Sequence, residues 1–166
     1  MVRFSVRATA LGALLFLGTA CAAQDRAPAA AAPQEALSAQ AAEAAATVDA
    51  FHAALRRGDT AAASALLTED VLVFEEGRAE RSKSEYAVRH LGADAEFSKA
   101  VSGKVGRRRG SAAGDFAWIA TEGRTRGSFR GTEVDRVTDE TMVLRRIDGA
   151  WKIVHIHWSS AQSSVE

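Results

Sequence analysis

The sequence predicts an α+β fold in which helices come first and an antiparallel run of strands follows. In residues 41–55 the apolar side chains recur at helical spacing, whereas from residue 101 onward they alternate with polar ones, as they do in strands. Turn signals containing glycine separate the alternating segments. The chain has 166 residues, of which 47% are hydrophobic, so it can build one domain with a substantial core.

The first helix is expected to begin near Glu35 and to end at Gly58. Val48, Phe51 and Leu55 are spaced three and four residues apart, so they form one apolar stripe along the helix. Gly58 favours the left-handed backbone conformation that commonly ends a helix. This long amphipathic helix is the element against which a sheet would pack.

Three shorter elements are expected after it. A short helix over 61–67 precedes a strand over 71–75, whose sequence VLVFE is rich in β-branched and aromatic residues. Ser82 and Glu85 then have the spacing of a capping box, which opens a third helix. We expect that helix to close at Gly92.

The second half of the chain is predicted to be a meander of strands. An alternating segment begins at Val101, and further strands are expected over 116–124, 134–147 and 151–159. The last two are joined by the Asp-Gly pair at 148–149, a dipeptide typical of tight β-hairpins.

The register of this last hairpin decides which residues face the core. We expect a three-residue loop with a bulge, because that register groups a wholly apolar set on the inner face. The inner set would be Met142, Leu144, Val154, Ile156 and Trp158. The opposite face then carries a mixed set, too apolar for plain solvent, that includes Val143, Trp151, Ile153, His155 and His157.

The N-terminal segment is predicted to be an export signal. Arg3 and Arg7 precede a short apolar stretch over 10–20, and small residues follow it, as in bacterial signal peptides. We expect a signal peptide over 1–23 and a periplasmic or secreted protein. The alternative is a lipoprotein signal ending before Cys21, with the acylated cysteine as the membrane anchor.

The rest of the chain divides into a tether, a domain and a tail. Residues 24–36 are rich in alanine and include prolines without apolar periodicity, which indicates a flexible tether. The folded domain is expected over 37–160, followed by a short tail over 161–166. Cys21 is the only cysteine of the chain, so this domain can contain no disulfide.

Three segments carry a family resemblance: FHAALRRGDTAAASALL (51–67), VLVFEEG (71–77) and TMVLRRIDGAWKIVHIHWS (141–159). Together they resemble the NTF2-like superfamily, and most closely its SnoaL-like and DUF4440 group. The last segment is also similar to the association domain of calcium/calmodulin-dependent protein kinase II. The resemblance implies a cone, in which a curved antiparallel sheet wraps around a long N-terminal helix and leaves a pocket in the open mouth. It also implies dimerisation through the outer face of the sheet.

The resemblance points to Glu75 as the candidate catalytic residue. In the steroid-isomerase branch a carboxylate general base lies near this place, and a carboxyl beside an apolar cavity suits proton transfer next to a carbonyl group. That branch also has a tyrosine oxyanion donor on its first helix, where this chain has Phe51. We therefore predict that Glu75 is not a strong catalytic base. The alternative is that Glu75 and Glu76 are merely solvated at a strand end.

Aromatic and apolar residues are predicted to line the pocket. Tyr86 and His90 lie four residues apart on the third helix, so they share a face at the mouth. The full predicted lining is Phe51, Phe74, Tyr86, His90, Ile119, Met142, Leu144 and Trp158. The alternative is that most of these residues are simply core.

A pair of histidines, His155 and His157, lies two residues apart on a strand, so both side chains point to one face. We interpret this face as a dimer interface that also includes Trp151 and Ile153. Such a pair can serve a metal, but spacing alone is a weak pattern. Neither a metal site nor a cofactor is expected.

Composition and motifs argue against several function classes. The 21 lysines and arginines balance the 21 aspartates and glutamates, so no net charge attracts nucleic acid or an anionic membrane. The sequence has no glycine-rich phosphate loop, zinc-protease motif or serine nucleophile elbow. We predict an exported domain that binds a small apolar molecule or a partner in its cone, without demonstrable catalysis. The alternatives are a cofactor-independent isomerase or dehydratase using Glu75, and a homodimeric assembly module with a filled cone.

Overall fold

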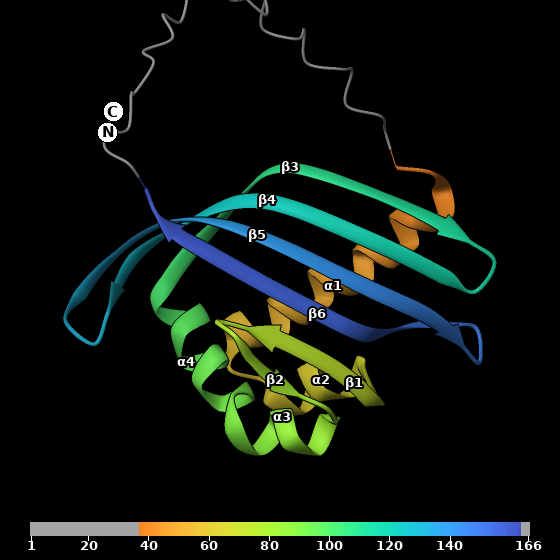
Figure 1. Cartoon of the computed structure of the whole chain (residues 1–166), viewed down its shortest axis with the longest axis horizontal. Helices are drawn as coiled ribbons and strands as arrows, with labels where there is room; N and C mark the ends of the chain where they lie inside the picture. The colour runs from red at the N-terminus through yellow and green to blue at the C-terminus, as the bar shows by residue number, and fades with distance from the viewer. Residues whose placement is uncertain (1–36, 164–166) are drawn as a thin grey trace, which may run out of the picture. The chain divides into compact units, whose positions relative to one another are not determined.

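The computed structural model describes residues 37–163, and Figure 1 shows a curved sheet lying in front of the long helix α1. The predicted signal peptide, the tether and Cys21 lie outside the described residues. The predicted tail is partly a strand, because the last strand continues to Gln162. Among the described helices, none combines the length and the apolar character needed to cross a membrane.

Helix α1 (Ala39–Arg57) is the predicted amphipathic helix, although it begins four residues later than expected. Ser38 caps its first turn, because the side-chain oxygen accepts a hydrogen bond from a backbone N–H at 3.3 Å. Gly58 ends the helix in the left-handed conformation, with φ at 73°. The apolar stripe is buried along its whole length: Ala41, Ala44, Val48, Phe51 and Leu55.

The next three elements are short. Helix α2 (Thr60–Ala65) is capped by Asp59 and leads directly into strand β1 (Leu67–Glu75). Strand β1 therefore begins four residues earlier than predicted, and the helix is shorter than 61–67. Strand β2 (Arg78–Glu80), which the sequence pattern does not reveal, pairs antiparallel with the end of β1.

Two helices stand where one was predicted, α3 (Lys83–Arg89) and α4 (Leu91–Ala100). The predicted cap at Ser82 is confirmed, since its hydroxyl accepts a backbone N–H of the first turn at 3.1 Å. The prediction that the helix closes at Gly92 is wrong. His90 leaves the helical region, with φ at −125°, and separates the two helices, so Gly92 lies inside α4.

Four long strands complete the sheet: β3 (Val101–Ala113), β4 (Phe116–Phe129), β5 (Thr132–Ile147) and β6 (Ala150–Gln162). The strand order is β2-β1-β6-β5-β4-β3. The sheet is mixed rather than wholly antiparallel, because β1 pairs with β6 in the parallel sense. Helix α1 packs against β3, β4 and β6, which defines the inner face of the sheet.

The turn between β5 and β6 has two residues, not the predicted three. Asp148 and Gly149 both have positive φ, 50° and 79°, as a tight hairpin turn requires. Ile153 therefore pairs with Leu144 and faces inward, where both are fully buried. Trp151 is also buried, at 6% exposure. The assignment of Trp151 and Ile153 to an outer dimer face is wrong, because the short turn gives them the opposite orientation.

A bulge farther along the hairpin restores the register that was predicted for its far end. Val154 has no partner on β5, so the pairing shifts by one residue there. Beyond the bulge Ile156 pairs with Met142, and both are fully buried. Trp158 consequently faces the core and His157 is exposed on the outer face, as predicted.

Candidate functional site

A row of mostly polar side chains crosses the inner face of the sheet where the apolar core ends. The preceding row is wholly apolar, and its paired residues are Val73, Ile156, Met142 and Ile119. In the next row the strand register aligns Glu75, Trp158, Glu140, Thr121 and Arg108, which we call the polar row. Helix α1 lies over the polar row: the Phe51 ring stacks on Trp158, with ring centroids 6.3 Å apart.

Glu75 occupies the β1 end of the polar row. It follows Val71 and Val73 in the inward-facing alternation of the strand, so its carboxyl is drawn toward the core. Burial, followed by the negative charges of Asp94 and Glu76, raises the pKa of Glu75 from 4.5 to about 7. A carboxyl with that pKa is present in both protonation states near neutral pH, so it can give or take a proton.

Tyr86 and Asp94 form a buried hydrogen-bonded pair close to Glu75. The Tyr86 hydroxyl donates to Asp94 Oδ2 at 2.6 Å, which joins α3 to α4. Burial raises the pKa of Asp94 above its ordinary value, although the hydrogen bond from Tyr86 opposes the shift. Burial and the adjacent Asp94 also raise the pKa of Tyr86 well above its ordinary value. Because Tyr86 is fully buried and already donates, it is not free to bind a ligand.

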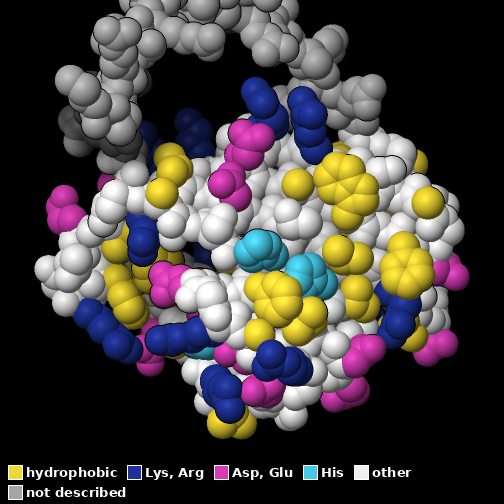
Figure 2. Space-filling model, viewed as in Figure 1, with side chains coloured by type: hydrophobic (Ala, Val, Ile, Leu, Met, Phe, Trp, Pro, Cys, Tyr) yellow, Lys and Arg dark blue, Asp and Glu magenta, His cyan; other side chains and the backbone are white. Residues whose placement is uncertain are grey.

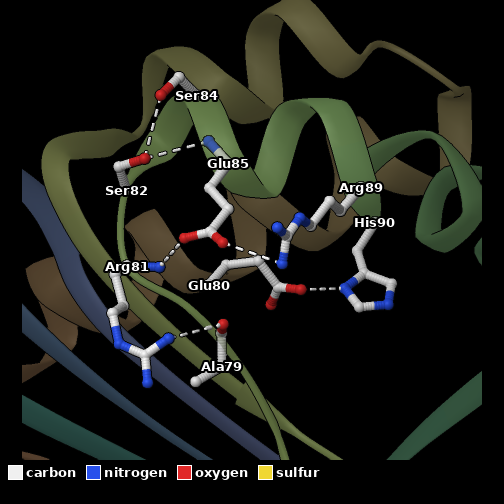
Figure 3. A network of polar contacts seen from close by, with 8 residues as sticks. All are labelled: Ala79, Glu80, Arg81, Ser82, Ser84, Glu85, Arg89 and His90. Carbon is white, nitrogen blue, oxygen red and sulfur yellow. Dashed lines mark hydrogen bonds and ion pairs between the residues drawn. The ribbon is translucent and has the colours of Figure 1, made fainter.

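Glu80, the last residue of β2, and His90, between α3 and α4, form a second pair (Figure 3). The Glu80 side chain is only 2% exposed, and its Oε1 is hydrogen-bonded to His90 Nδ1. Its other oxygen, Oε2, is buried and has no partner among the described residues. Both residues line an open depression of about 520 Å³, together with Arg78, Ala79 and Arg89.

The contacts of Glu85 lie beside this pair, at the junction of β2 and α3. Glu85 reaches back to accept the Arg81 backbone N–H at 2.8 Å and pairs with Arg89 at 2.9 Å, as Figure 3 shows. These contacts tie the start of α3 to the end of β2.

Glu140 is the centre of the polar row. Its side chain is 9% exposed, and Oε2 accepts hydrogen bonds from His52 Nε2 at 2.6 Å and from Trp158 Nε1 at 2.7 Å. Burial alone raises the pKa of Glu140, but these hydrogen bonds outweigh it and hold the pKa below its ordinary value. Beside it, Arg108 forms an ion pair with Asp49 of α1 at 2.8 Å.

The outer face of the sheet is partly apolar. Figure 2 shows two histidine side chains among hydrophobic ones on this face. The Phe74 ring packs edge-on against both His155 and His157, with centroids 5.2 and 6.2 Å away. Phe74 is 37% exposed there, so its assignment to the pocket lining is wrong. It follows Val73 on β1, and successive strand residues point to opposite faces.

The remaining predicted lining residues lie on the inner side. Phe51, Ile119, Met142 and Leu144 are fully buried in the core, where they fill the cone. The structure brings Glu75, Tyr86 and His90 into one neighbourhood, and Trp158 lies next to Glu75 across the sheet.

Sequence reasoning missed Asp94 and the role of Glu140. Glu140 has the same strand parity as Met142 and Leu144, so the alternation alone places it on the inner face. Asp94 carried no such signal, because α4 itself was not predicted. Within residues 37–163, no group of three or more histidine, cysteine or acidic side chains has an arrangement that could hold a metal ion.

The model of the SnoaL-like domain matches residues 44–163 of this chain. The chain belongs to the SnoaL-like domain family. Its fold is NTF2-like, and solved structures that share this fold are described as cystatin-like. No curated protein matches the chain in sequence.

Three solved structures illustrate the range of its relatives. A protein of Shewanella frigidimarina NCIMB 400, provisionally named a ketosteroid isomerase, is 35% identical with a TM-score of 0.70, over 75% of this chain and 100% of the other. A provisionally named dehydratase of the NTF2-like family from Streptomyces avermitilis is 20% identical with a TM-score of 0.62, and the match covers 75% of this chain and 97% of the other. The association domain of C. elegans CaMKII is 20% identical with a TM-score of 0.59, and the match covers 73% of this chain and 95% of the other. The last two show the fold alone.

Proposed function

We propose that the chain is a cofactor-independent isomerase or dehydratase that moves protons on a small, mostly apolar carbonyl compound, with Glu75 as its proton donor. One observation carries the proposal: Glu75 lies at the edge of an apolar core, beside Trp158, in a cluster of partly buried polar groups. No described residue hydrogen-bonds its carboxyl. The 35% identity to a provisionally named ketosteroid isomerase supports the same class.

The donor role fits the residues around it better than the role of a strong base. Phe51 cannot hydrogen-bond a developing enolate, and Tyr86 already donates to Asp94. An enolate formed by a base alone would therefore lack a donor from either residue. A neutral Glu75 that protonates the substrate oxygen as the C–H bond breaks avoids building up that charge.

The test compares wild type, Glu75→Gln and the matched control Glu76→Gln on a β,γ-unsaturated ketosteroid and on smaller enolisable ketones in D2O. We expect isomerisation or deuterium exchange above background in wild type and Glu76→Gln, and a loss of at least about 100-fold in Glu75→Gln. Glu76 is exposed, and its charge contributes less than burial to the raised pKa of Glu75, so its substitution leaves the Glu75 carboxyl in place and changes mainly the local charge. Equal rates in the two variants would overturn the assignment of Glu75.

A second proposal concerns assembly. We propose that two copies of the chain pair through the outer-face patch, which consists of Phe74, Trp118, Val143, His155 and His157. Phe74 and Trp118 are 37% and 44% exposed. Exposure of large aromatic side chains to water is unfavourable, and such a patch commonly marks a surface that a partner covers. The fold is shared with an association domain, which supports a second copy as the partner.

Sedimentation of Phe74→Asp tests this proposal, since the change places a charge in the patch without disturbing the core. We expect the wild type to be a dimer at tens of micromolar and the variant to be a monomer. Val88→Asp is the control, because Val88 is 87% exposed on α3. A monomeric wild type, or a Phe74→Asp dimer, would contradict the proposal.

A further inference from the structure

The two oxygens of the buried Glu140 carboxylate differ in their hydrogen bonding. Both hydrogen bonds that it accepts, from His52 and Trp158, go to Oε2. Its Oε1 is buried without a partner among the described residues. Burying a carboxylate with one oxygen unpaired costs stability, so this arrangement is poorly explained as a device for holding the fold together.

The contact fixes which nitrogen of the His52 ring donates to Glu140. An ionised carboxylate only accepts hydrogen bonds, so His52 Nε2 must be the donor of the 2.6 Å contact. In the neutral imidazole the proton then sits on Nε2, and Nδ1 carries the free lone pair. The His52 side chain is 30% exposed, and no described residue hydrogen-bonds Nδ1. Nε2 is therefore held by Glu140, while Nδ1 has no partner among the described residues.

His52 and Glu75 lie on either side of Trp158. On the sheet, Trp158 is the neighbour of both Glu75 and Glu140, and neighbouring strands are about 4.8 Å apart. The backbones of Glu75 and Glu140 are thus about 10 Å apart, two strand spacings. That separation matches the length of a small carbon skeleton, which would contact both the Glu75 carboxyl and the His52 ring beside the stacked rings of Phe51 and Trp158.

We propose that His52 is the second proton-transfer residue of the site, with Nδ1 as the base that works opposite Glu75, and that Glu140 is the positioning residue that holds its tautomer. This inference rests on the proposed function of Glu75. The substrate class is a ketone with a hydrogen on the carbon next to the carbonyl group.

The step balances without a cofactor. His52 Nδ1 takes the proton of the C–H bond, and the two electrons of that bond form a C=C bond to the carbonyl carbon. The carbonyl π electrons move to oxygen, which takes the proton of the Glu75 carboxyl and becomes an enol hydroxyl. Return of the proton from His52 to a conjugated carbon, with return of the enol proton to Glu75, completes an isomerisation.

The kinetic test uses the full domain and the same ketosteroid and ketone probes. His52→Gln keeps a side-chain N–H for Glu140 but has no base, so we expect kcat to fall by at least about 100-fold. Val88→Gln, at a position on α3 that is 87% exposed and lies outside the site and the outer-face patch, is the control and is expected to leave kcat unchanged. In wild type, kcat/KM is expected to fall at high pH as Glu75 ionises. His52→Gln is expected to keep this high-pH fall, because Glu75 is unchanged.

The positioning role has a readout that does not depend on turnover. Imidazole ¹⁵N NMR of wild type is expected to show His52 as the Nε2–H tautomer, and Glu140→Gln is expected to give a mixture of tautomers with a roughly 10-fold lower kcat. Circular dichroism and NMR dispersion report whether each variant is folded.

The outcomes separate the two proposals. Wild-type kcat in His52→Gln, with activity lost in Glu75→Gln, overturns the role of His52 and leaves the proposed function standing. An Nδ1–H tautomer in wild type overturns the role of His52 whatever the rates. A wild type inactive on every probe overturns the proposed function, and this inference with it.

Discussion

Replacing Glu75 by glutamine is expected to make the folded domain more stable at pH 8 but not at pH 4. The carboxyl has a pKa of about 7 in the folded protein, against 4.5 ordinarily, mainly because of its burial. The folded state therefore holds a proton that the unfolded state has already lost between these two values. Stability falls as the pH rises from about 4.5 to 7, and the loss is complete above that window.

The size of the effect follows from the two pKa values. A rise from 4.5 to about 7 corresponds to at most about 3 kcal/mol at pH 8. Because the Glu75 side chain is not fully removed from water, solvent screening reduces this to about 1–2 kcal/mol. Glutamine is nearly isosteric and does not ionise, so Glu75→Gln is expected to recover that amount.

Urea unfolding of wild type and Glu75→Gln at several pH values between 4 and 8.5 measures the difference. We expect the two proteins to be equally stable at pH 4 and to diverge as the pH rises through 5 to 7. Glu76→Gln is the control: Glu76 is exposed and its charge raises the Glu75 pKa less than burial does, so its substitution is expected to give a smaller difference than Glu75→Gln. A constant difference across this range, or a variant that is less stable at pH 8, would refute the argument that burial is what raises the pKa.

Three further predictions test the register, the packing and the N-terminal segment. Ile153→Ala is expected to lower the free energy of unfolding by about 2–4 kcal/mol, because the side chain is fully buried. His157→Ala is expected to change the free energy of unfolding by less than about 0.5 kcal/mol, because His157 is exposed. Urea unfolding of both variants distinguishes a register with Ile153 inside from one with Ile153 outside. Gly110→Ala is expected to cost about 1–3 kcal/mol, because a Cβ there would lie 2.8 Å from the Trp118 backbone oxygen as well as 2.6 Å from Ile119 Cδ1, and an unchanged melting temperature would contradict this. Intact-mass analysis of protein from its own host is expected to show that residues 1–20 have been removed, and their retention would rule out cleavage of an export signal.

The parts of the fold that are set by local pattern could be predicted from the sequence. The buried stripe of α1, its glycine cap and the Ser82 cap each depend on residues within a turn or two of one another. The inward position of Trp158 was also predicted, although for a partly wrong reason. A three-residue turn and a two-residue turn with a bulge at Val154 place the same β6 residues on the inner face beyond the bulge. They differ only in which face the residues between the turn and the bulge occupy.

The site was harder to predict because its contacts join distant segments. Glu140 and His52 are 88 positions apart, and nothing local marks them as partners. Strand parity alone puts Glu140 on the inner face, but only the register of β5 against β6 brings it beside Trp158. Asp94 was missed because a helix with Gly92 in its first turn lacks a strong helical signal.

Glu75 and Glu140, the two carboxyls of the polar row, favour different protonation states because their neighbours differ. Glu140 accepts two short hydrogen bonds from His52 and Trp158, which stabilise its ionised form despite burial. Glu75 has no described donor and faces other negative groups, so burial favours its neutral form. One carboxyl is thus an acceptor that orients a base, and the other is an acid able to release its proton near neutral pH. Paired titratable groups whose environments push their pKa values apart are the usual basis of an acid–base division of roles. A purely structural polar cluster would gain nothing from leaving Glu75 without a donor, which is why the Glu75→Gln variant is expected to be more stable and less active at the same pH.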